Sequence, residues 1–329
     1  MAVFMSMHAA RLAEAAQTDD HFGLMDQVYR RQRHFYDLTR KYYLLGRDAL
    51  IRVLDAATGA LVKVLDTRAH AMFSIHVAWA PDGVRILSAG YDSTVRVWDL
   101  SPESCRVSER RLAGHTNKVS VVTWAPPGGD RLLMASGSND GGCCLWNVAT
   151  GECLRTLVGA KNIQVWSLSF SEDGSRIASG GGDGFVRAFE VSSGECLKAF
   201  EVHDGHVYSV AWSNDGTLLA SGGSDKKIII CDVSSDAADA DEGGALKTLR
   251  GHSAAPHGIA WAPSGALLAS SDDSGIRIWD VATGGCVREV AMDFENSHFS
   301  VRQKLAWSPD GARLAALKRG ALSVFDASR

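Results

Sequence analysis

Apolar and polar residues alternate along most of the chain in short runs separated by turn sequences. The segment from Gly205 to Asp232 reads GHVYSVAWSNDGTLLASGGSDKKIIICD: an alternating run ends in Trp212, an Asn-Asp-Gly turn follows, and two further apolar runs flank an Asp. Alternation with a period of two is typical of strands with one buried face, and Asp-Gly turns are typical of hairpins. Since a further strand follows the next Thr-Gly or Ser-Gly turn, each such unit is predicted to contain four antiparallel strands.

Copies of this unit recur from Ala69 to the end of the chain. In most copies an Asp precedes an apolar anchor by six residues, as Asp225 precedes Cys231. The seven anchors, separated by 44, 48, 43, 42, 48 and 46 residues, are Leu54, Trp98, Trp146, Phe189, Cys231, Trp279 and Phe325. With its Gly-His and Trp-Asp dipeptides, the chain from about residue 42 onward resembles the WD-repeat family, whose period is about 40 to 45 residues. The resemblance implies an all-β fold, a WD-repeat β-propeller in which each unit is one four-stranded sheet.

The number of blades depends on how the first and last units begin and end. The anchors give seven blade positions, but the first unit begins at its second strand and the last unit stops after its third. Seven blade positions with an incomplete first and last unit are therefore favoured; in the alternative of six blades, Ala60 to Leu65 completes the sixth. We expect residues 41–329 to form this propeller as one domain, because stacked repeats share a continuous core.

Residues 1–40 lack the repeat pattern. Met25, Val28 and Tyr29 recur at helical spacing with several arginines nearby, so a basic helical arm is predicted. The string MDQVYRRQRHFYDLTRKYYLLGRDALI, residues 25–51, resembles the start of the S-adenosylmethionine-dependent methyltransferases that make betaine lipids. In that family a glycine-rich turn holds the cofactor, whereas Gly59 stands alone here. A remnant or fusion of such a lipid methyltransferase, lacking its cofactor loop, is the alternative interpretation of the chain, and no cofactor is expected.

Composition and charge argue against a membrane protein and against a nucleic-acid-binding one. The formal net charge of the 329 residues is −4, and no run approaches the about 20 apolar residues that span a bilayer. The seven cysteines show neither zinc spacing nor a disulfide framework, so we expect reduced thiols, no metal and an intracellular location, cytoplasmic or nuclear. Three of them share one repeat position inside a strand, which predicts small buried side chains: Cys153, Cys196 and Cys286.

Histidine, serine and aspartate recur together, which invites a hydrolase interpretation. An enzyme needs one such site, and here the set is repeated in unit after unit, so a structural role is preferred and no catalytic residue is predicted. In the WD-repeat proteins that the chain resembles, the Gly-His histidine, a second-strand Ser or Thr, the turn Asp and the third-strand Trp form a buried hydrogen-bond network. The resemblance assigns this network to His115, Ser136, Asp140, Trp146, His206, Ser221, Asp225, Asp92, Trp98, His252, Asp273 and Trp279. The unit around Asp183 has Ala160-Lys161 in place of Gly-His and should be held less firmly.

A propeller also presents loops and strand starts around its central channel. Positions four residues before each inner-strand aromatic, and positions just before each turn Asp, should lie near the mouth of that channel. Those predicted to form a partner-binding face are Tyr91, Asn139, Trp166, Tyr208, Ser224 and His257. Exposed aromatic side chains often anchor protein interfaces, although burial between blades would leave them a packing role only. The sequence thus predicts a non-catalytic scaffold that binds other proteins; a propeller that binds nucleic acid would need a more basic rim.

Overall fold

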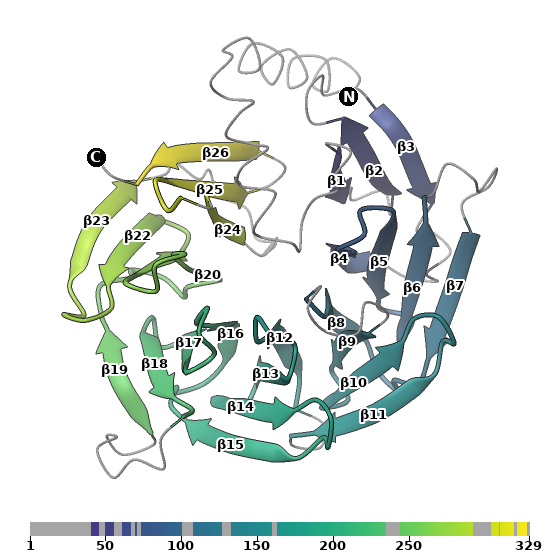
Figure 1. Ribbon diagram of the computed structural model, residues 1–329, viewed down its shortest axis with the longest axis horizontal. Coiled ribbons are helices and arrows are strands. Elements are labelled where there is room, and N and C mark those ends of the chain that lie inside the picture. Colours follow the sequence, from purple (N-terminus) through teal and green to yellow (C-terminus); the bar gives the residue numbers. More distant parts are fainter. Residues whose placement is uncertain are drawn as a thin grey trace.

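The structure, a computed structural model, forms a ring of seven antiparallel sheets (Figure 1). It describes residues 41–45, 50–55, 61–66, 70, 74–100, 108–126, 133–159, 163–234, 244–291, 304–308, 310–318 and 321–327. Every regular element among these residues is a β-strand, which confirms the predicted all-β propeller. The predicted helical arm, residues 1–40, lies outside the described residues.

In each sheet, here called a blade, the strands lie side by side in chain order. Blade 1 contains β1 (Lys41–Leu45), β2 (Leu50–Asp55) and β3 (Leu61–Asp66), and blade 2 contains β4 (Ser74–Trp79), β5 (Arg85–Gly90), β6 (Thr94–Asp99) and β7 (Ser108–Ala113). Blade 3 contains β8 (Val119–Trp124), β9 (Leu133–Ser138), β10 (Gly142–Asn147) and β11 (Cys153–Val158), and blade 4 contains β12 (Val165–Phe170), β13 (Arg176–Gly181), β14 (Phe185–Glu190) and β15 (Cys196–Glu201). Blade 5 contains β16 (Val207–Trp212), β17 (Leu218–Gly223), β18 (Ile228–Asp232) and β19 (Ala245–Leu249). Blade 6 contains β20 (Gly258–Trp261), β21 (Leu267–Ser271), β22 (Gly275–Asp280) and β23 (Cys286–Ala291), and blade 7 contains β24 (Lys304–Trp307), β25 (Arg313–Lys318) and β26 (Ala321–Asp326).

The end blades decide between the two predicted blade counts. Among the described residues, blades 1 and 7 have three strands each and the five blades between them have four. Strand β3 pairs with β2 from Leu50↔Asp66 to Leu54↔Leu61. This segment is therefore the outer strand of blade 1, so the alternative in which it completes a sixth blade is wrong. Seven blades with incomplete end units are confirmed.

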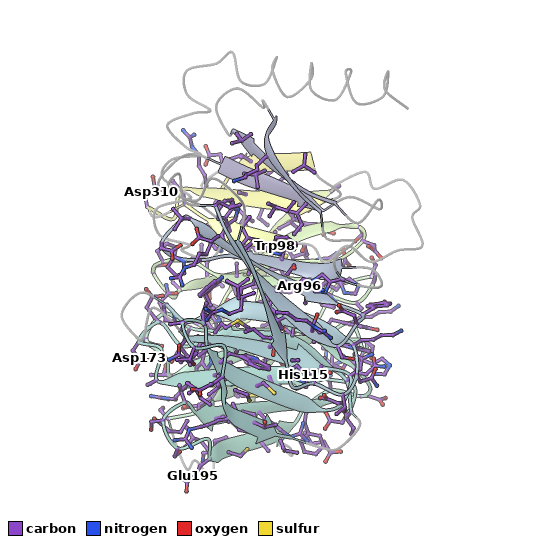
Figure 2. The ribbon with its side chains drawn as sticks, turned by 90° about the vertical axis from the view of Figure 1, so that its right-hand side faces the viewer. Arg96, Trp98, His115, Asp173, Glu195 and Asp310 are labelled. Carbon is purple, nitrogen blue, oxygen red and sulfur yellow. The ribbon has the colours of Figure 1, made fainter. Side chains whose placement is uncertain are left out.

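In blades 2, 4, 5, 6 and 7 the hairpin after the inner strand contains an Asp-Gly or Ser-Gly pair. In blade 5, Gly216 has a φ of 71°, a left-handed conformation that glycine adopts without steric cost. The Asp215 carboxylate accepts a hydrogen bond from the N–H of Thr217 at 3.0 Å and closes the turn. Asp173 and Asp310, in the same turn of blades 4 and 7, lie towards one side of the disc, whereas Arg96 and His115 lie nearer the other (Figure 2).

An apolar layer between every two consecutive blades forms the core. Six clusters of buried side chains each combine residues of one blade with residues of the next, from blades 1 and 2 through to blades 6 and 7. Tryptophans at the ends of inner strands also donate to the inner strand before them: the indole N–H of Trp124 reaches the Ala78 carbonyl at 3.3 Å, and that of Trp307 reaches Ala260 at 3.0 Å. Each blade is thus stabilised mainly by its neighbours, as in other repeat proteins.

A basic side chain on the outer strand links one blade to the next. The third residue of four outer strands donates to main-chain carbonyls at or just after the end of the third strand of the following blade. Arg155 donates to Ser193 at 3.1 Å and Lys247 to Val281 at 2.8 Å. Arg110 reaches Val148 at 2.9 Å, and Arg288 donates to the Asp326 carbonyl. The outer rim is therefore held by contacts that run in one direction around the ring.

Five of the outer strands contain a β-bulge at their second residue. In blade 3, for example, Leu145 and Trp146 pair with Arg155 and Cys153, so Leu154 has no partner of its own. The side chains at these bulges are aliphatic and between 42% and 63% exposed: Val62, Leu154, Leu197, Leu246 and Val287. Strand β7 of blade 2 is different, because it pairs with β6 in unbroken register from Thr94↔Ala113 to Asp99↔Ser108.

Candidate functional site

A buried chain of hydrogen bonds crosses blade 3 from its third strand to its entry loop. The indole N–H of Trp146 donates to Ser136 Oγ at 2.7 Å, and Ser136 Oγ lies 2.8 Å from His115 Nε2. His115 Nδ1 lies 3.0 Å from Asp140 Oδ2. One arrangement of protons uses every group: the serine hydroxyl donates to Nε2, and Nδ1–H donates to the carboxylate. These four residues are the ones that the sequence groups together in this blade.

Blade 2 contains the same arrangement around a histidine that the sequence analysis does not assign. His70 Nδ1 lies 2.8 Å from Asp92 Oδ1, and its Nε2 lies 2.9 Å from Ser88 Oγ. The indole N–H of Trp98 donates to the same hydroxyl at 2.9 Å. Burial lowers the pKa of His70, against the effect of its Asp92 hydrogen bond, and so favours the neutral imidazole.

In blade 5 the histidine of the Gly-His dipeptide is not the buried one, which corrects the assignment of His206. His203 Nδ1 lies 2.9 Å from Asp225 Oδ1 and its Nε2 lies 2.8 Å from Ser221 Oγ. His206 is exposed, with Nδ1 3.2 Å from the Gly182 carbonyl. The physical reason is spacing: His203 precedes the inner-strand Trp212 by nine residues, the same interval that separates the buried histidines of blades 2 and 3 from their inner-strand tryptophans.

Blade 6 requires a second correction, from Asp273 to Asp272. His252 Nδ1 lies 3.0 Å from Asp272 Oδ2, while its Nε2 lies 2.6 Å from Ser270 Oγ, which also accepts the indole N–H of Trp279 at 2.7 Å. Asp273 is exposed. The interval from the network serine to the carboxylate falls from four residues in blade 3 to two in blade 6, while the hairpin from Ser270 to Trp279 is only one residue shorter, so the carboxylate that reaches the histidine lies seven residues before the tryptophan instead of six.

Hydrogen bonds keep the network carboxylates ionised although they are largely buried. Burial disfavours the charge of Asp225, but the hydrogen bond and charge of His203, together with Lys227, lower its pKa to about 2. At Asp272, burial is likewise outweighed by His252, Ser274 and the Ala254 N–H, which hold the pKa well below its usual range. These carboxylates are consequently poor proton acceptors for a reaction near neutral pH.

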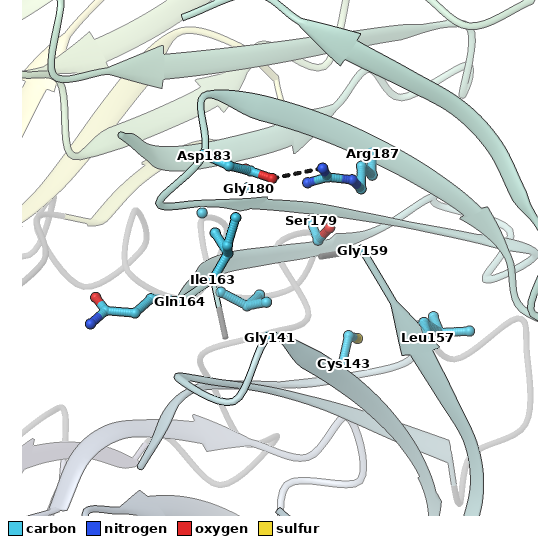
Figure 3. A pocket seen from close by; sticks show the side chains of 12 residues that line it. Gly141, Cys143, Leu157, Gly159, Ile163, Gln164, Ser179, Gly180, Asp183 and Arg187 are labelled. Atoms are coloured by element: carbon cyan, nitrogen blue, oxygen red, sulfur yellow. Dashed lines mark ion pairs between the residues drawn. The ribbon is translucent and has the colours of Figure 1, made fainter. Parts of the chain in front are cut away.

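In blade 4 the turn aspartate pairs with an arginine of the third strand. Asp183 Oδ2 lies 2.6 Å from Nη2 of Arg187, a pair shown by the dashed line in Figure 3. Beside them a cavity of about 10 Å³, the space of one water molecule, is lined by Ser179, Gly180 and Ile163 among others. A cavity of this size cannot admit a substrate or an organic cofactor.

These networks do not form an active site. The histidine side chains of blades 2, 3, 5 and 6 are at most 2% exposed, so no substrate can reach the imidazoles. In the part of the chain that the structure describes, no three side chains of His, Cys, Asp or Glu are close enough to hold a metal ion. The networks instead satisfy buried polar groups inside each blade.

Aromatic side chains gather on one face of blades 4 to 6. The rings of Trp166 and Tyr208 are stacked, with centroids 5.1 Å apart and planes at 4°. His257 packs against the Tyr208 ring at 4.7 Å, and His206 meets the edge of Trp166 at 4.6 Å. All four side chains, named here the aromatic group, are partly or fully exposed. Three of them are residues predicted for the partner-binding face; His206 is the one that sequence reasoning placed elsewhere.

The other predicted face residues fall into two sets. Ser224 belongs beside the aromatic group, because its hydroxyl accepts a hydrogen bond from the His206 N–H at 2.8 Å. Tyr91 lies under the ammonium group of Lys118, 4.2 Å from the ring centroid, and the Asn139 N–H donates to the Lys118 carbonyl. Tyr91 and Asn139 are thus joined through Lys118.

The cysteine prediction is wrong for the outer strands. Cys153, Cys196 and Cys286 are exposed, because the first residue of each outer strand lies on the rim of the disc, whereas Cys143, Cys144 and Cys231 are buried. Burial raises the pKa of Cys144 and of Cys231 to about 12, which keeps these thiols protonated.

A membrane-spanning helix is absent from the portion of the chain described. The buried chains of His, Ser, Asp and Trp, repeated from blade to blade, are what the resemblance to WD repeats implies for the residues of this fold.

Comparison with known proteins supports the same architecture. The family described as "WD domain, G-beta repeat" matches residues 60–99, 106–147, 151–190, 194–232 and 243–280, and none of these ranges includes the methyltransferase-like stretch of residues 25–51. THO complex subunit 3 of Arabidopsis thaliana is 29% identical over 103 residues, which cover 31% of this chain and 31% of that protein.

Two further relatives show a comparable partial match. Nuclear distribution protein PAC1 of Arthroderma benhamiae is 31% identical over 117 residues, which cover 34% of this chain and 25% of the relative. Small ribosomal subunit protein RACK1 of Caenorhabditis elegans is 42% identical over 84 residues, covering 26% and 24%. The chain thus spans about a third or less of the length of each of these relatives, while the repeat matches cover more than half of the chain. On the repeat matches, the chain belongs to the WD-repeat family.

Proposed function

We propose that this protein is a non-catalytic platform on which other proteins assemble, and that the aromatic group is one of its binding sites. The aromatic group carries the proposal: four partly or fully exposed rings from three blades contact one another on one face. Large aromatic side chains at a surface supply much of the binding energy of protein interfaces. The relatives named above include a complex subunit and a ribosomal subunit protein, which is consistent with a role in assemblies.

The geometry favours a preformed site. Trp166 and Tyr208 project from inner strands of adjacent blades, and the Val210 N–H donates to Ser167 Oγ at 3.0 Å between the same two strands. His206 is fixed by Gly182 and Ser224. Because the rings already rest on one another, a partner would order few additional rotamers on binding, which reduces the entropic cost of association.

Protein partners fit the surface better than the other classes considered. A formal charge of −4 gives no general attraction for nucleic acid or for anionic membranes. We therefore infer protein partners in an intracellular compartment, cytoplasmic or nuclear, and no cofactor or metal.

The test is quantitative affinity purification of a Trp166→Ala, Tyr208→Ala double variant beside the wild-type chain. The matched control is Leu154→Ala, which removes a side chain that is 50% exposed on the outer rim. We expect a set of proteins that co-purify with the wild type and the control to be lost with the double variant, while circular dichroism and thermal unfolding show a folded propeller. Recovery of the same proteins in the same yield with all three would refute the proposed site.

A further inference from the structure

In the described part of the chain, two of the blades end in an outer strand without a β-bulge, β7 in blade 2 and β26 in blade 7. A β-bulge interrupts the edge of a sheet and twists it, which hinders pairing with another strand. Strands β3, β11, β15, β19 and β23 all carry such a bulge, whereas β7 pairs with β6 over all of its residues without a shift. Among the described strands, β7 also lies at the end of its sheet. Its backbone is therefore one of two straight outer edges that can accept a further strand, and it is the one that carries basic residues, since β26 reads ALSVFD.

On the same strand an arginine lies opposite another arginine. Arg111 on β7 lies directly opposite Arg96 on β6. Like charges at directly opposite positions of a sheet repel one another and are destabilising. Arg96 is held by Asp92, with Nη2 3.6 Å from Oδ2, but that carboxylate also serves His70 and Thr94. Arg111 is exposed, and the described residues provide no carboxylate in contact with its guanidinium.

Blade 6 shows what compensates an arginine at this position. There Arg277, the counterpart of Arg96, lies opposite Glu289, the counterpart of Arg111. Nη2 of Arg277 lies 2.5 Å from Oε1 of Glu289, and Nη1 lies 3.7 Å from the network carboxylate of Asp272. In blade 2 the propeller has a second arginine where blade 6 has a carboxylate.

Arg110 does not take part, although it is the adjacent residue. Successive side chains of a strand point to opposite sides, and the guanidinium of Arg110 is used by the carbonyls of Val148 and Ala149 in blade 3. Arg111 is thus the basic side chain of β7 left to face an incoming anion.

We propose that β7 is a docking edge for an extended acidic segment of a partner protein, which adds a strand to blade 2 and places a carboxylate against Arg111. Backbone hydrogen bonds from the straight edge provide the affinity, and the Arg96–Arg111 pair selects for acidic residues. This site is separate from the aromatic group, since it lies on the rim of another blade.

The probe is a fluorescent peptide of about eight residues in which valine and glutamate alternate, so that all carboxylates lie on one side of the strand. Fluorescence anisotropy should show binding to the wild-type chain, weakened by salt, and no binding of the same peptide with lysine in place of glutamate. Arg111→Glu should weaken binding by about tenfold or more, the loss expected when a charge-assisted hydrogen bond is removed. That variant recreates the arginine–glutamate pair of blade 6, so it should unfold at the wild-type temperature or above.

Two controls separate the contribution of the straight edge from that of the arginine pair, and this site from the aromatic group. Glu289→Arg builds the same arginine pair in blade 6 on a bulged edge, and we expect it to gain no second peptide site; a gain would refute the requirement for a straight edge. Trp166→Ala with Tyr208→Ala should leave peptide binding unchanged, so failure of this proposal and failure of the aromatic site give different results. Absence of binding to the wild type, equal binding to Arg111→Glu, or tighter binding of a single-stranded oligonucleotide that is lost in Arg111→Glu would overturn the proposal.

Discussion

Replacing His203 tests the network of blade 5 most directly. The side chain is fully buried, and His203→Ala removes one partner of Asp225 Oδ1, which keeps the Lys227 N–H at 3.3 Å, and one partner of Ser221 Oγ. Asp225 keeps Lys227, whose ammonium lies 3.2 Å from Oδ2, and Ser221 keeps the Ile229 carbonyl at 3.4 Å. Weakening the hydrogen bonding of these two buried groups, Asp225 and Ser221, should therefore lower the free energy of unfolding by about 1 kcal/mol for each group, the low end for a buried group that loses a partner.

The space left by the imidazole adds to that loss. A cavity of this size in a packed layer costs about 1 kcal/mol more, so the total is about 3 kcal/mol. In a domain of this length about 2 °C is lost per kcal/mol, and thermal unfolding followed by circular dichroism should shift down by about 6 °C. His206→Ala is the matched control: the side chain is exposed, is bonded to one carbonyl and meets the edge of Trp166, so a loss of about 1 kcal/mol or less is expected.

A double-mutant cycle with Asp225→Ala completes the test. If His203 and Asp225 act together, the double variant should be less destabilised than the sum of the two single variants, by about 1 kcal/mol or more. Equal losses for His203→Ala and His206→Ala, or strict additivity in the cycle, would refute the assignment.

Three further predictions concern the other polar and thiol groups. Asp272→Asn should lower the free energy of unfolding in urea by about 2 kcal/mol or more, because it weakens a fully buried acceptor of His252. Asp273→Asn should change stability little, since Asp273 is exposed. The reverse order would contradict the corrected assignment. Stability should fall on acidification, because the pKa of Asp225 is lowered from 3.8 to about 2. The contribution of Asp225 to the free energy of unfolding is therefore complete above pH 4 and is lost as the pH falls through 2. Asp225→Asn should flatten this part of the profile of unfolding temperature against pH. Mass spectrometry after brief alkylation of the native protein should find the rim thiols modified and the buried thiols modified only after unfolding; labelling of the buried thiols at the same rate would contradict the observed burial of Cys143, Cys144 and Cys231.

The repeated residue pattern of the sequence was sufficient to predict the propeller, because each blade has the same arrangement of strands and turns. Alternation and Asp-Gly turns define the hairpins, and the tryptophan and aspartate intervals define the unit. The same counting put Trp166 and Tyr208 at equivalent positions of adjacent blades, and the structure adds that their rings are stacked.

The errors arose where one blade departs from the average unit. His206 stands in a Gly-His dipeptide, but burial depends on distance from the inner strand, and the interval of nine residues to Trp212 would have selected His203. Asp273 preserved the interval of six residues, yet in blade 6 the interval from the network serine to the carboxylate falls to two residues, which brings Asp272 to the histidine. The exposure of Cys153 could not be predicted from the strand pattern alone, because it depends on which strand forms the rim.

The basic links at the rim bear on how such a ring can diversify. Arg155, Lys247 and Arg288 all donate to main-chain carbonyls, and none depends on a particular side chain in the next blade. Because the acceptor is a main-chain carbonyl, the hydrogen bond does not depend on which side chains the next blade has in that turn, and substitutions there leave it intact. Duplication or exchange of a whole blade would likewise preserve the hydrogen bond, provided that the new unit keeps one basic residue and one turn in place. The rim can therefore keep the same contacts between blades while the faces of individual blades evolve towards different partners.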